Sequence, residues 1–173
     1  MSFASDDFAL FDLPRRFALD AADLAARRRA LQAEVHPDRF AGGGAAAQRV
    51  AMQWAVRVNE AYERLADPLK RAAYLCELGG VPLRAEDNTA MPPEFLLQQM
   101  TWREGLEEAD SRQAVEAIAA DIDRRRRDAH AELGRAIDGA ADYEAAAKQV
   151  RALMFIERFA ADVDDRLAAL EGS

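Results

Sequence analysis

The stretch HPDRF at residues 36–40, followed by AGGG at 41–44, separates two helical patterns in the first half of the chain. Pro37 lacks an amide proton and has a fixed φ, and it keeps the preceding His36 out of the α region. A helix that runs into His36 is therefore expected to end there, and the glycines provide slack before the next helix. The sequence predicts a tight, exposed loop that presents an imidazole, a carboxylate and a guanidinium side by side. On these residues alone, the loop could also be a helix break with polar filler.

Helices are predicted on both sides of this loop. Asp20 is expected to cap a helix that ends at His36, and a second helix is expected over about 45–65, before Pro68 starts a shorter third one. The third helix is expected to end near Leu78, because two glycines follow it. The apolar stripe of the second helix is predicted to contain Val50, Trp54, Ala55, Val58, Tyr62 and Leu65. A short segment ahead of these helices is expected to dock through Phe8, Leu10, Phe11 and Phe17.

The composition favours a helical protein without disulfides. The 173 residues are 50% hydrophobic and include only 9 glycines and 6 prolines. The single cysteine, Cys76, excludes an internal disulfide and a multi-cysteine metal site, and we expect a buried thiol. No secretion signal or membrane-spanning stretch is recognisable, so we expect a cytoplasmic protein. Neither a metal nor another cofactor is expected.

The net charge of −8 is unevenly distributed along the chain. Residues 1–78 carry 11 basic and 11 acidic side chains, whereas residues 79–173 carry 12 basic and 20 acidic ones. Residues 27–71, which flank the loop, hold 9 basic and 5 acidic side chains. A basic unit joined to an acidic unit suggests two surfaces for two partners, and the overall negative charge argues against nucleic-acid binding.

We expect an all-α protein with an N-terminal domain at residues 1–78, a linker at 79–92 and a three-helix bundle at 93–173. The linker is rich in glycine, proline and polar residues. Arg124–Arg127 interrupts the apolar stripe of the middle bundle helix, so at least one of these arginines must pack its aliphatic stem against the bundle. The three helices are predicted over about 93–109, 111–138 and 142–171, with Asp110 or Ser111 and Asp142 as caps. The last helix has a regular apolar seam at Leu153, Ile156, Ala160, Val163, Leu167 and Leu170.

The first bundle helix carries more apolar side chains than a core stripe needs. At about 100° per residue, Phe95, Trp102, Leu106 and Ala109 form the stripe. The other side of this helix carries Leu96, Leu97, Met100, Thr101, Glu104 and Glu108, while Met154 and Phe155 lie away from the seam of the last helix. An apolar patch rimmed by glutamate is typical of an interface. These residues could instead pack against the N-terminal domain, and the sequence does not show whether the two helices are adjacent.

Four segments give the chain a resemblance to a known family: FALFDLP at 8–14, HPDRF at 36–40, VNEAYERLADPLKRAAYL at 58–75 and EFLLQQMTWREGLEE at 94–108. Together they resemble the HscB family of J-domain co-chaperones, over nearly the whole chain. The resemblance implies a J domain, a helical hairpin with the His-Pro-Asp loop at its tip, packed against a C-terminal three-helix bundle in an L shape. It also implies that the J domain docks on a dedicated DnaK-type chaperone, HscA, and stimulates its ATP hydrolysis. The bundle would bind the iron–sulfur scaffold protein IscU and deliver it to that chaperone for iron–sulfur cluster assembly.

The resemblance also implies roles for particular residues. The chaperone-binding set is His36, Pro37, Asp38, Arg39, Arg27, Arg28, Arg29, Lys70 and Arg71. The scaffold-binding set is Leu96, Leu97, Met100, Thr101, Glu104, Glu108 and Phe155. Thr101 stands where the family often has a carboxylate, so its polar contact differs. The arginine run at 27–29 could also be an ordinary solvated helix face.

The chain itself is expected to be a monomer and not an enzyme, but the activator of a partner ATPase. His36 and Asp38 resemble a base and its orienting carboxylate, yet no serine or cysteine nucleophile and no phosphate-binding glycine loop accompanies them. One alternative is a J-domain adaptor whose bundle binds a different client. A second, from another class, is a small hydrolase that uses His36 and Asp38.

Overall fold

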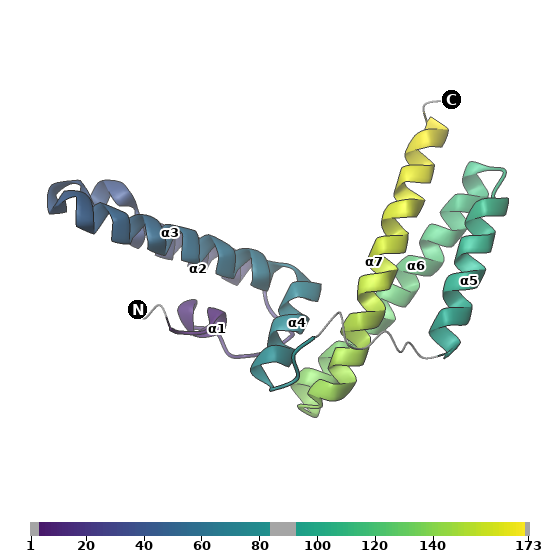
Figure 1. The fold of residues 1–173 in the computed structure, drawn as a ribbon, viewed down its shortest axis with the longest axis horizontal. Coiled ribbons are helices and arrows are strands. Elements are labelled where there is room, and N and C mark those ends of the chain that lie inside the picture. The colour runs from purple at the N-terminus through teal and green to yellow at the C-terminus, as the bar shows by residue number, and fades with distance from the viewer. Residues whose placement is uncertain (1–3, 84–92, 172–173) are drawn as a thin grey trace. The chain divides into compact units, whose positions relative to one another are not determined.

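The computed structural model describes residues 4–83 and 93–171, and within these ranges the regular elements are all helical (Figure 1). The all-α prediction is therefore confirmed. The helices are α1 (Asp7–Leu10), α2 (Ala21–Val35), the 3-10 helix η1 (Pro37–Gly43), α3 (Gly44–Ala66), α4 (Pro68–Leu78), α5 (Pro93–Glu108), α6 (Arg112–Gly134), the π-helical turn η2 (Arg135–Gly139) and α7 (Tyr143–Glu171). None of the helices in the described ranges has both the length and the apolar character that a bilayer span requires.

The chain divides into two compact units, Met1–Leu75 and Cys76–Ser173. Most of the predicted linker, at residues 84–92, lies outside the described residues. The last turn of α4 belongs to the second unit, where Cys76 and Gly79 lie against Tyr143. A Cβ atom on Gly79 would lie 2.4 Å from the Tyr143 ring, so this close approach requires glycine. Burial raises the pKa of the Cys76 thiol to about 11, so the buried thiol predicted from the sequence stays neutral at pH 7.

The first unit is built on the antiparallel pair α2 and α3, which lie side by side (Figure 1). Asp20 caps α2 as predicted, because its carboxylate accepts hydrogen bonds from the amides of Ala22 and Asp23 at 2.8 and 3.2 Å. The helix ends at Val35, directly before the His-Pro-Asp loop. The predicted third helix is α4, which begins at Pro68 as expected.

The predicted apolar stripe of α3 is partly wrong. Val50 is 48% exposed, and the residues that α3 buries are Ala51, Val58, Ala61 and Leu65. Ala51 and Ala61 lie in the same arc of α3 as Val58 and Leu65 but were omitted from the predicted stripe, and their small side chains let α3 approach its neighbours closely. A pattern that weights large apolar residues underestimates such positions.

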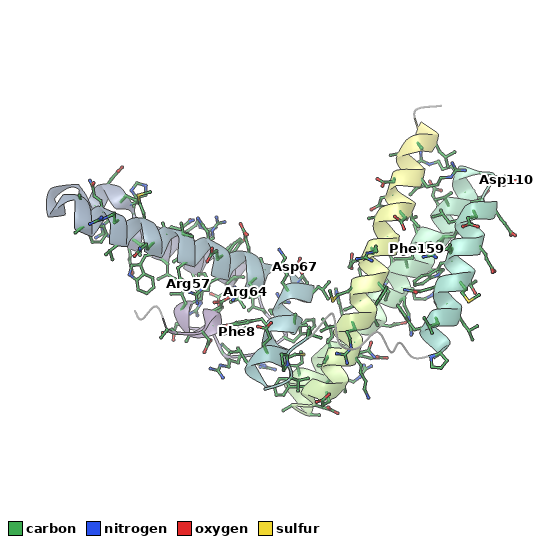
Figure 2. All side chains as sticks on the ribbon, viewed as in Figure 1. Phe8, Arg57, Arg64, Asp67, Asp110 and Phe159 are labelled. Atoms are coloured by element: carbon green, nitrogen blue, oxygen red, sulfur yellow. The ribbon has the colours of Figure 1, made fainter. Side chains whose placement is uncertain are left out.

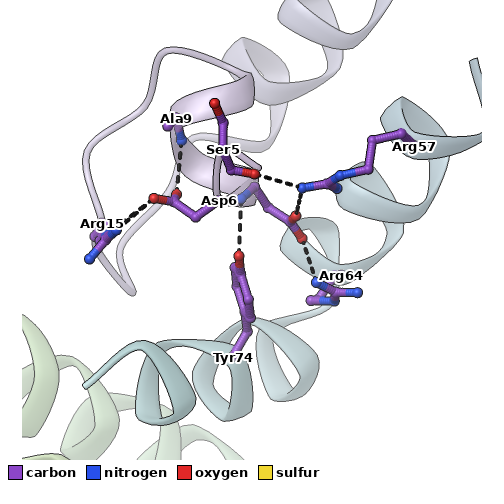
Figure 3. Close-up of polar contacts among 8 residues, drawn as sticks. Ser5, Asp6, Ala9, Arg15, Arg57, Arg64 and Tyr74 are labelled. Carbon is purple, nitrogen blue, oxygen red and sulfur yellow. Dashed lines mark hydrogen bonds and ion pairs between the residues drawn. The ribbon is translucent and has the colours of Figure 1, made fainter. Parts of the chain in front are cut away.

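A buried ion-pair cluster anchors the segment ahead of α2 to α3 and α4 (Figure 3). The fully buried Asp7 has one carboxylate oxygen 2.7 Å from Arg57 Nη2 and the other 3.0 Å from Arg64 Nη1. Its backbone amide donates to the Tyr74 hydroxyl at 3.1 Å, and Phe8 stacks on the Tyr74 ring. Two guanidinium groups compensate the cost of burying the carboxylate. Burial of the apolar docking residues is confirmed for Phe8, Leu10, Phe11 and Phe17.

The second unit contains the bundle of α5, α6 and α7, which run alongside one another (Figure 1). Ser111 and Asp142 act as the predicted caps, because their side chains accept from the amides of Ala114 at 3.3 Å and Ala145 at 3.0 Å. The first four residues of the predicted α7 seam are buried: Leu153, Ile156, Ala160 and Val163. The helix boundaries of the bundle therefore follow the sequence expectation closely.

Of the four consecutive arginines of α6, Arg126 is the one that turns toward a neighbouring helix. It makes a bidentate pair with Glu157 of α7, with nitrogen–oxygen distances of 2.7 and 2.9 Å. The hydrogen bond to Glu157 raises the pKa of the Arg126 guanidinium. Arg124, Arg125 and Arg127 are exposed. The expectation that at least one arginine must pack on the bundle is confirmed.

Candidate functional site

The His-Pro-Asp loop is formed by an abrupt change of backbone conformation after α2. His36 is extended, with φ −61° and ψ 128°, and Pro37 opens η1. The His36 Nδ1 atom accepts a hydrogen bond from the Asp38 amide at 3.3 Å, so the neutral ring carries its proton on Nε2. The side chains of His36 and Asp38 are 59% and 91% exposed. The prediction of an exposed loop is confirmed, and its two polar groups are available to a partner.

The third polar side chain of the loop, Arg39, is exposed as predicted and in addition contacts the end of α2. Its guanidinium donates to the Ala33 carbonyl at 3.1 Å, and its amide donates to the His36 carbonyl at 3.0 Å. Arg39 therefore ties the loop to the last turn of α2, because that turn leaves carbonyl groups without helical partners. Gly44, with φ +78°, ends the loop in a conformation that favours glycine.

The predicted basic surface is smaller than the resemblance implied. Arg71 is 8% exposed and donates to the carbonyls of Phe17 and Leu65 at 2.9 and 2.5 Å, so its expected position on the surface is wrong. It lies inside because it shares the buried side of α4 with Leu75, one helical turn further on. That spacing was readable from the sequence.

The arginine run on α2 also contains side chains that make contacts within the protein. Arg27 donates to the carbonyls of Phe11 and Asp12 at 2.9 and 2.8 Å, which fixes the preceding segment. The Arg28 guanidinium lies 4.3 Å from the centre of the Tyr62 ring on α3. Of the basic residues predicted outside the loop, Arg29 and Lys70 are exposed and remain open to a partner.

The outward face predicted for α5 is observed. Leu96, Leu97 and Met100 are 47%, 64% and 57% exposed, whereas Phe95 and Trp102 are buried in the bundle. Thr101, Glu104 and Glu108 are also exposed, and the Thr101 hydroxyl donates to the Leu97 carbonyl at 3.1 Å. The rotation derived from the sequence is thus confirmed, while the binding role of these residues remains a prediction.

The structure also shows that α5 and α7 are adjacent at this face. The exposed Phe155 packs edge-on against Phe95, with ring centroids 6.4 Å apart. One turn further along α7, Phe159 stacks on Trp102 at 5.8 Å. The exposed apolar side chains of these two adjacent helices include Leu96, Leu97 and Met100 of α5 and Phe155 of α7, and we call these four residues the outer apolar face.

A partly buried hydrogen bond that was not predicted fixes the rotation of α5. Trp102 Nε1 donates to Asp121 Oδ2 of α6 at 2.7 Å, and Arg124 binds the other carboxylate oxygen. The hydrogen bond from Trp102, together with the neighbouring Arg124, holds the pKa of Asp121 below its usual value. A tryptophan in a predicted core stripe needs an acceptor for its N–H, and this was the signal available in the sequence. Because Trp102 faces inward, Leu96 and Leu97 face outward.

No group of three or more histidine, cysteine, aspartate or glutamate side chains within residues 4–83 and 93–171 is arranged to hold a metal ion.

Comparisons with known proteins agree with this arrangement. Residues 91–164 match the family described as the HSCB C-terminal oligomerisation domain. The chain is 51% identical to the co-chaperone protein HscB homolog of Burkholderia multivorans and 50% identical to that of Burkholderia mallei, with 99% of each chain covered. The solved chaperone HscB from Vibrio cholerae is 35% identical, with a TM-score of 0.83, and covers 96% of this chain and 99% of its own. Human co-chaperone protein HscB is 27% identical, with a TM-score of 0.85, and the match covers 99% of this chain and 84% of the human one.

A helical hairpin with an exposed His-Pro-Asp loop, joined in one chain to a helical bundle and matched over its length by these relatives, defines a J-domain co-chaperone. The chain belongs to the HscB family. This membership supports a role as a co-chaperone in iron–sulfur cluster assembly, and co-chaperones are not themselves enzymes.

Proposed function

We propose that this protein stimulates the ATPase of an HscA-like DnaK-type chaperone and delivers an IscU-like iron–sulfur scaffold protein to it. The observation that carries the proposal is the presence of two chemically different exposed surfaces on two separate units. The first unit offers the polar His-Pro-Asp loop, and the second offers the outer apolar face. Family membership alone supports a role as a co-chaperone. The two surfaces support the assignment of chaperone binding to the first unit and scaffold binding to the second.

The loop is suited to a charge-assisted contact with the chaperone. Asp38 is almost fully exposed, so its carboxylate can accept a short hydrogen bond from an arginine of the chaperone. His36 offers Nε2–H as a donor, and Pro37 limits the entropy that the loop loses on docking. Arg29 and Lys70 add positive charge near an acidic partner surface, so the association is expected to weaken with salt. The hydrolytic machinery and Mg-ATP belong to the chaperone.

The outer apolar face is suited to a scaffold protein with a complementary apolar surface. Burial of one large apolar side chain is worth roughly 1.5–3 kcal/mol, so a partner that covers this face gains several such contributions. Glu104 and Glu108 at its edge would orient a partner with basic residues. Since one chain carries both surfaces, it raises the effective concentration of the scaffold at the chaperone. We propose that it acts as a cytoplasmic monomer without nucleic-acid partners.

The test is a steady-state ATPase assay of the HscA-type chaperone with this protein, in the presence and absence of IscU. The expected result is stimulation by the protein alone and a larger effect when IscU is present. An unchanged ATPase rate in both conditions would refute the proposal. If the protein stimulates the chaperone but does not bind IscU, the bundle serves a different client.

A further inference from the structure

A small groove lies between α5 and α7, next to the outer apolar face. Its volume is about 120 Å³. It is lined by Gln99, Arg103, Phe155, Arg158, Phe159 and Asp162. Phe159, labelled in Figure 2, is mostly buried, and the exposed Phe155 belongs both to this groove and to the outer apolar face. The groove is therefore continuous with the proposed scaffold-binding surface.

The two arginines of this groove have no ion-pair partner among the residues that the structure describes. Arg103 and Arg158 are exposed, and neither makes an ion pair or a hydrogen bond through its guanidinium to any residue in the described ranges. Arg112 and Arg126 of the same bundle, in contrast, are paired with Glu116 and Glu157 at 2.7 Å. Asp162 is the carboxylate in the groove lining, so two guanidinium groups face one negative charge.

The aromatic floor of the groove is held in place from behind. Phe159 stacks on the buried Trp102, which is itself hydrogen-bonded to Asp121, and Phe155 packs on the buried Phe95. A preformed floor with two cations at its edge needs little rearrangement to receive an anion. Its volume suits a single carboxylate side chain and is far below the roughly 300 Å³ at which small-molecule sites begin.

We propose that this groove is an anion-accepting subsite of the scaffold-binding face, which receives an aspartate or glutamate side chain of the IscU-type scaffold protein. The inference rests on the proposed function and extends it beyond the residues that the family resemblance implied. The face then has acidic residues, Glu104 and Glu108, at one edge and basic residues, Arg103 and Arg158, at the other. Such a division fixes the orientation of a docked partner, because the reversed orientation places like charges together.

The test is titration calorimetry of purified IscU against the full chain and three variants: Arg103→Gln, Arg158→Gln and the double substitution. Each single substitution is expected to weaken binding roughly three- to fivefold at low salt, and the double substitution roughly tenfold. The loss should shrink at about 0.5 M salt, where charges are screened. Arg158→Lys, which retains the charge, should recover most of the affinity.

The matched control is Arg127→Gln, which makes the same change in net charge on the exposed side of α6. If Arg127→Gln weakens binding as much as the groove variants do, the effect is one of overall charge and the subsite is refuted. If the double variant binds as the wild type does while Leu96→Ala with Phe155→Ala loses affinity, the subsite is refuted and the proposed function stands. If the wild type does not bind IscU, both are refuted. Thermal melts of each variant establish that the fold is retained.

Discussion

The His-Pro-Asp loop and the outer apolar face are both exposed, but they are held in place by different kinds of contact. The loop depends on near neighbours: Asp38 donates its amide to His36, and Arg39 reaches Ala33, six residues away. The outer apolar face depends on three helices, because the contacts behind it join Trp102 to Asp121 and Phe95 to Phe155. A point change in the loop should therefore alter the groups that the loop presents to a partner and leave the fold unchanged. A change behind the face should alter both shape and binding.

The largest effect is expected from His36→Gln, which removes the imidazole while leaving both neighbouring helices intact. Stimulation of the chaperone ATPase should be abolished, because the loop loses the imidazole ring and its Nε2–H donor. Binding of IscU should be unchanged, since the outer apolar face lies on the other unit. The measurements are steady-state ATPase rates and titration calorimetry. His130→Gln, which changes the other of the two histidines, should leave stimulation as in the wild type.

If His36→Gln loses both IscU binding and stimulation of the ATPase, the two surfaces do not act separately.

A smaller but still large effect is expected from Leu96→Ala combined with Phe155→Ala. Two anchors of the outer apolar face are truncated, and IscU affinity should fall on the order of 100-fold. Stimulation of the chaperone without IscU should persist, because the loop is untouched. Val56→Ala, an exposed apolar residue of α3, is the matched control and should leave IscU affinity unchanged. Unchanged affinity in the double variant would mean that the face is not the binding surface.

The third prediction separates inward and outward basic residues within the first unit. Arg71→Met keeps the aliphatic stem but removes charged donors to two backbone carbonyls, so unfolding free energy should fall by about 2 kcal/mol. Arg29→Ala should change it by less than about 0.5 kcal/mol, because Arg29 is exposed. Urea unfolding measures both. The opposite order of effects would contradict the assignment of Arg71 to the core.

Arg29→Ala is instead expected to lower chaperone stimulation, with the larger loss at low salt.

The smallest effect concerns the carboxylate behind the outer apolar face. The pKa of Asp121 is lowered from 3.8 in the folded protein, so its charged form stabilises the bundle above that value and this contribution is lost as pH falls below it. The contribution should be under about 1 kcal/mol, because the side chain is partly exposed. Thermal melts between about pH 6 and pH 2 should show a smaller loss of stability in Asp121→Asn than in the wild type.

Features set by neighbouring residues could be predicted from the sequence. The caps at Asp20, Ser111 and Asp142 and the break at His36 follow from local chemistry, and each is present. The outward rotation of α5 was also predictable, since helical geometry alone relates Trp102 to the residues behind it.

Features that depend on a distant partner could not be predicted. Arg71 was expected on the surface from the family resemblance; its spacing from Leu75 indicates the buried side of α4, but the carbonyls of Phe17 and Leu65 that accept from its guanidinium come from outside α4. The buried side of α3 depends on how closely α2 approaches small residues such as Ala51. The pairing of Arg126 with Glu157 likewise requires knowing which helices meet. The Arg103–Arg158 groove was missed for the same reason, since its walls come from two helices.

The ion-pair cluster at Asp7 has a consequence for how the chain is made. Arg64 and Tyr74, which fix Asp7, lie 57 and 67 residues after it in the chain and are therefore synthesised later. Domains emerging from the ribosome fold as units once their partners are available. The side chains of α1, Phe8 among them, therefore remain uncovered until α4 has emerged. The first unit can complete its fold only when nearly all of it has been translated, although α2 and α3 can pair earlier.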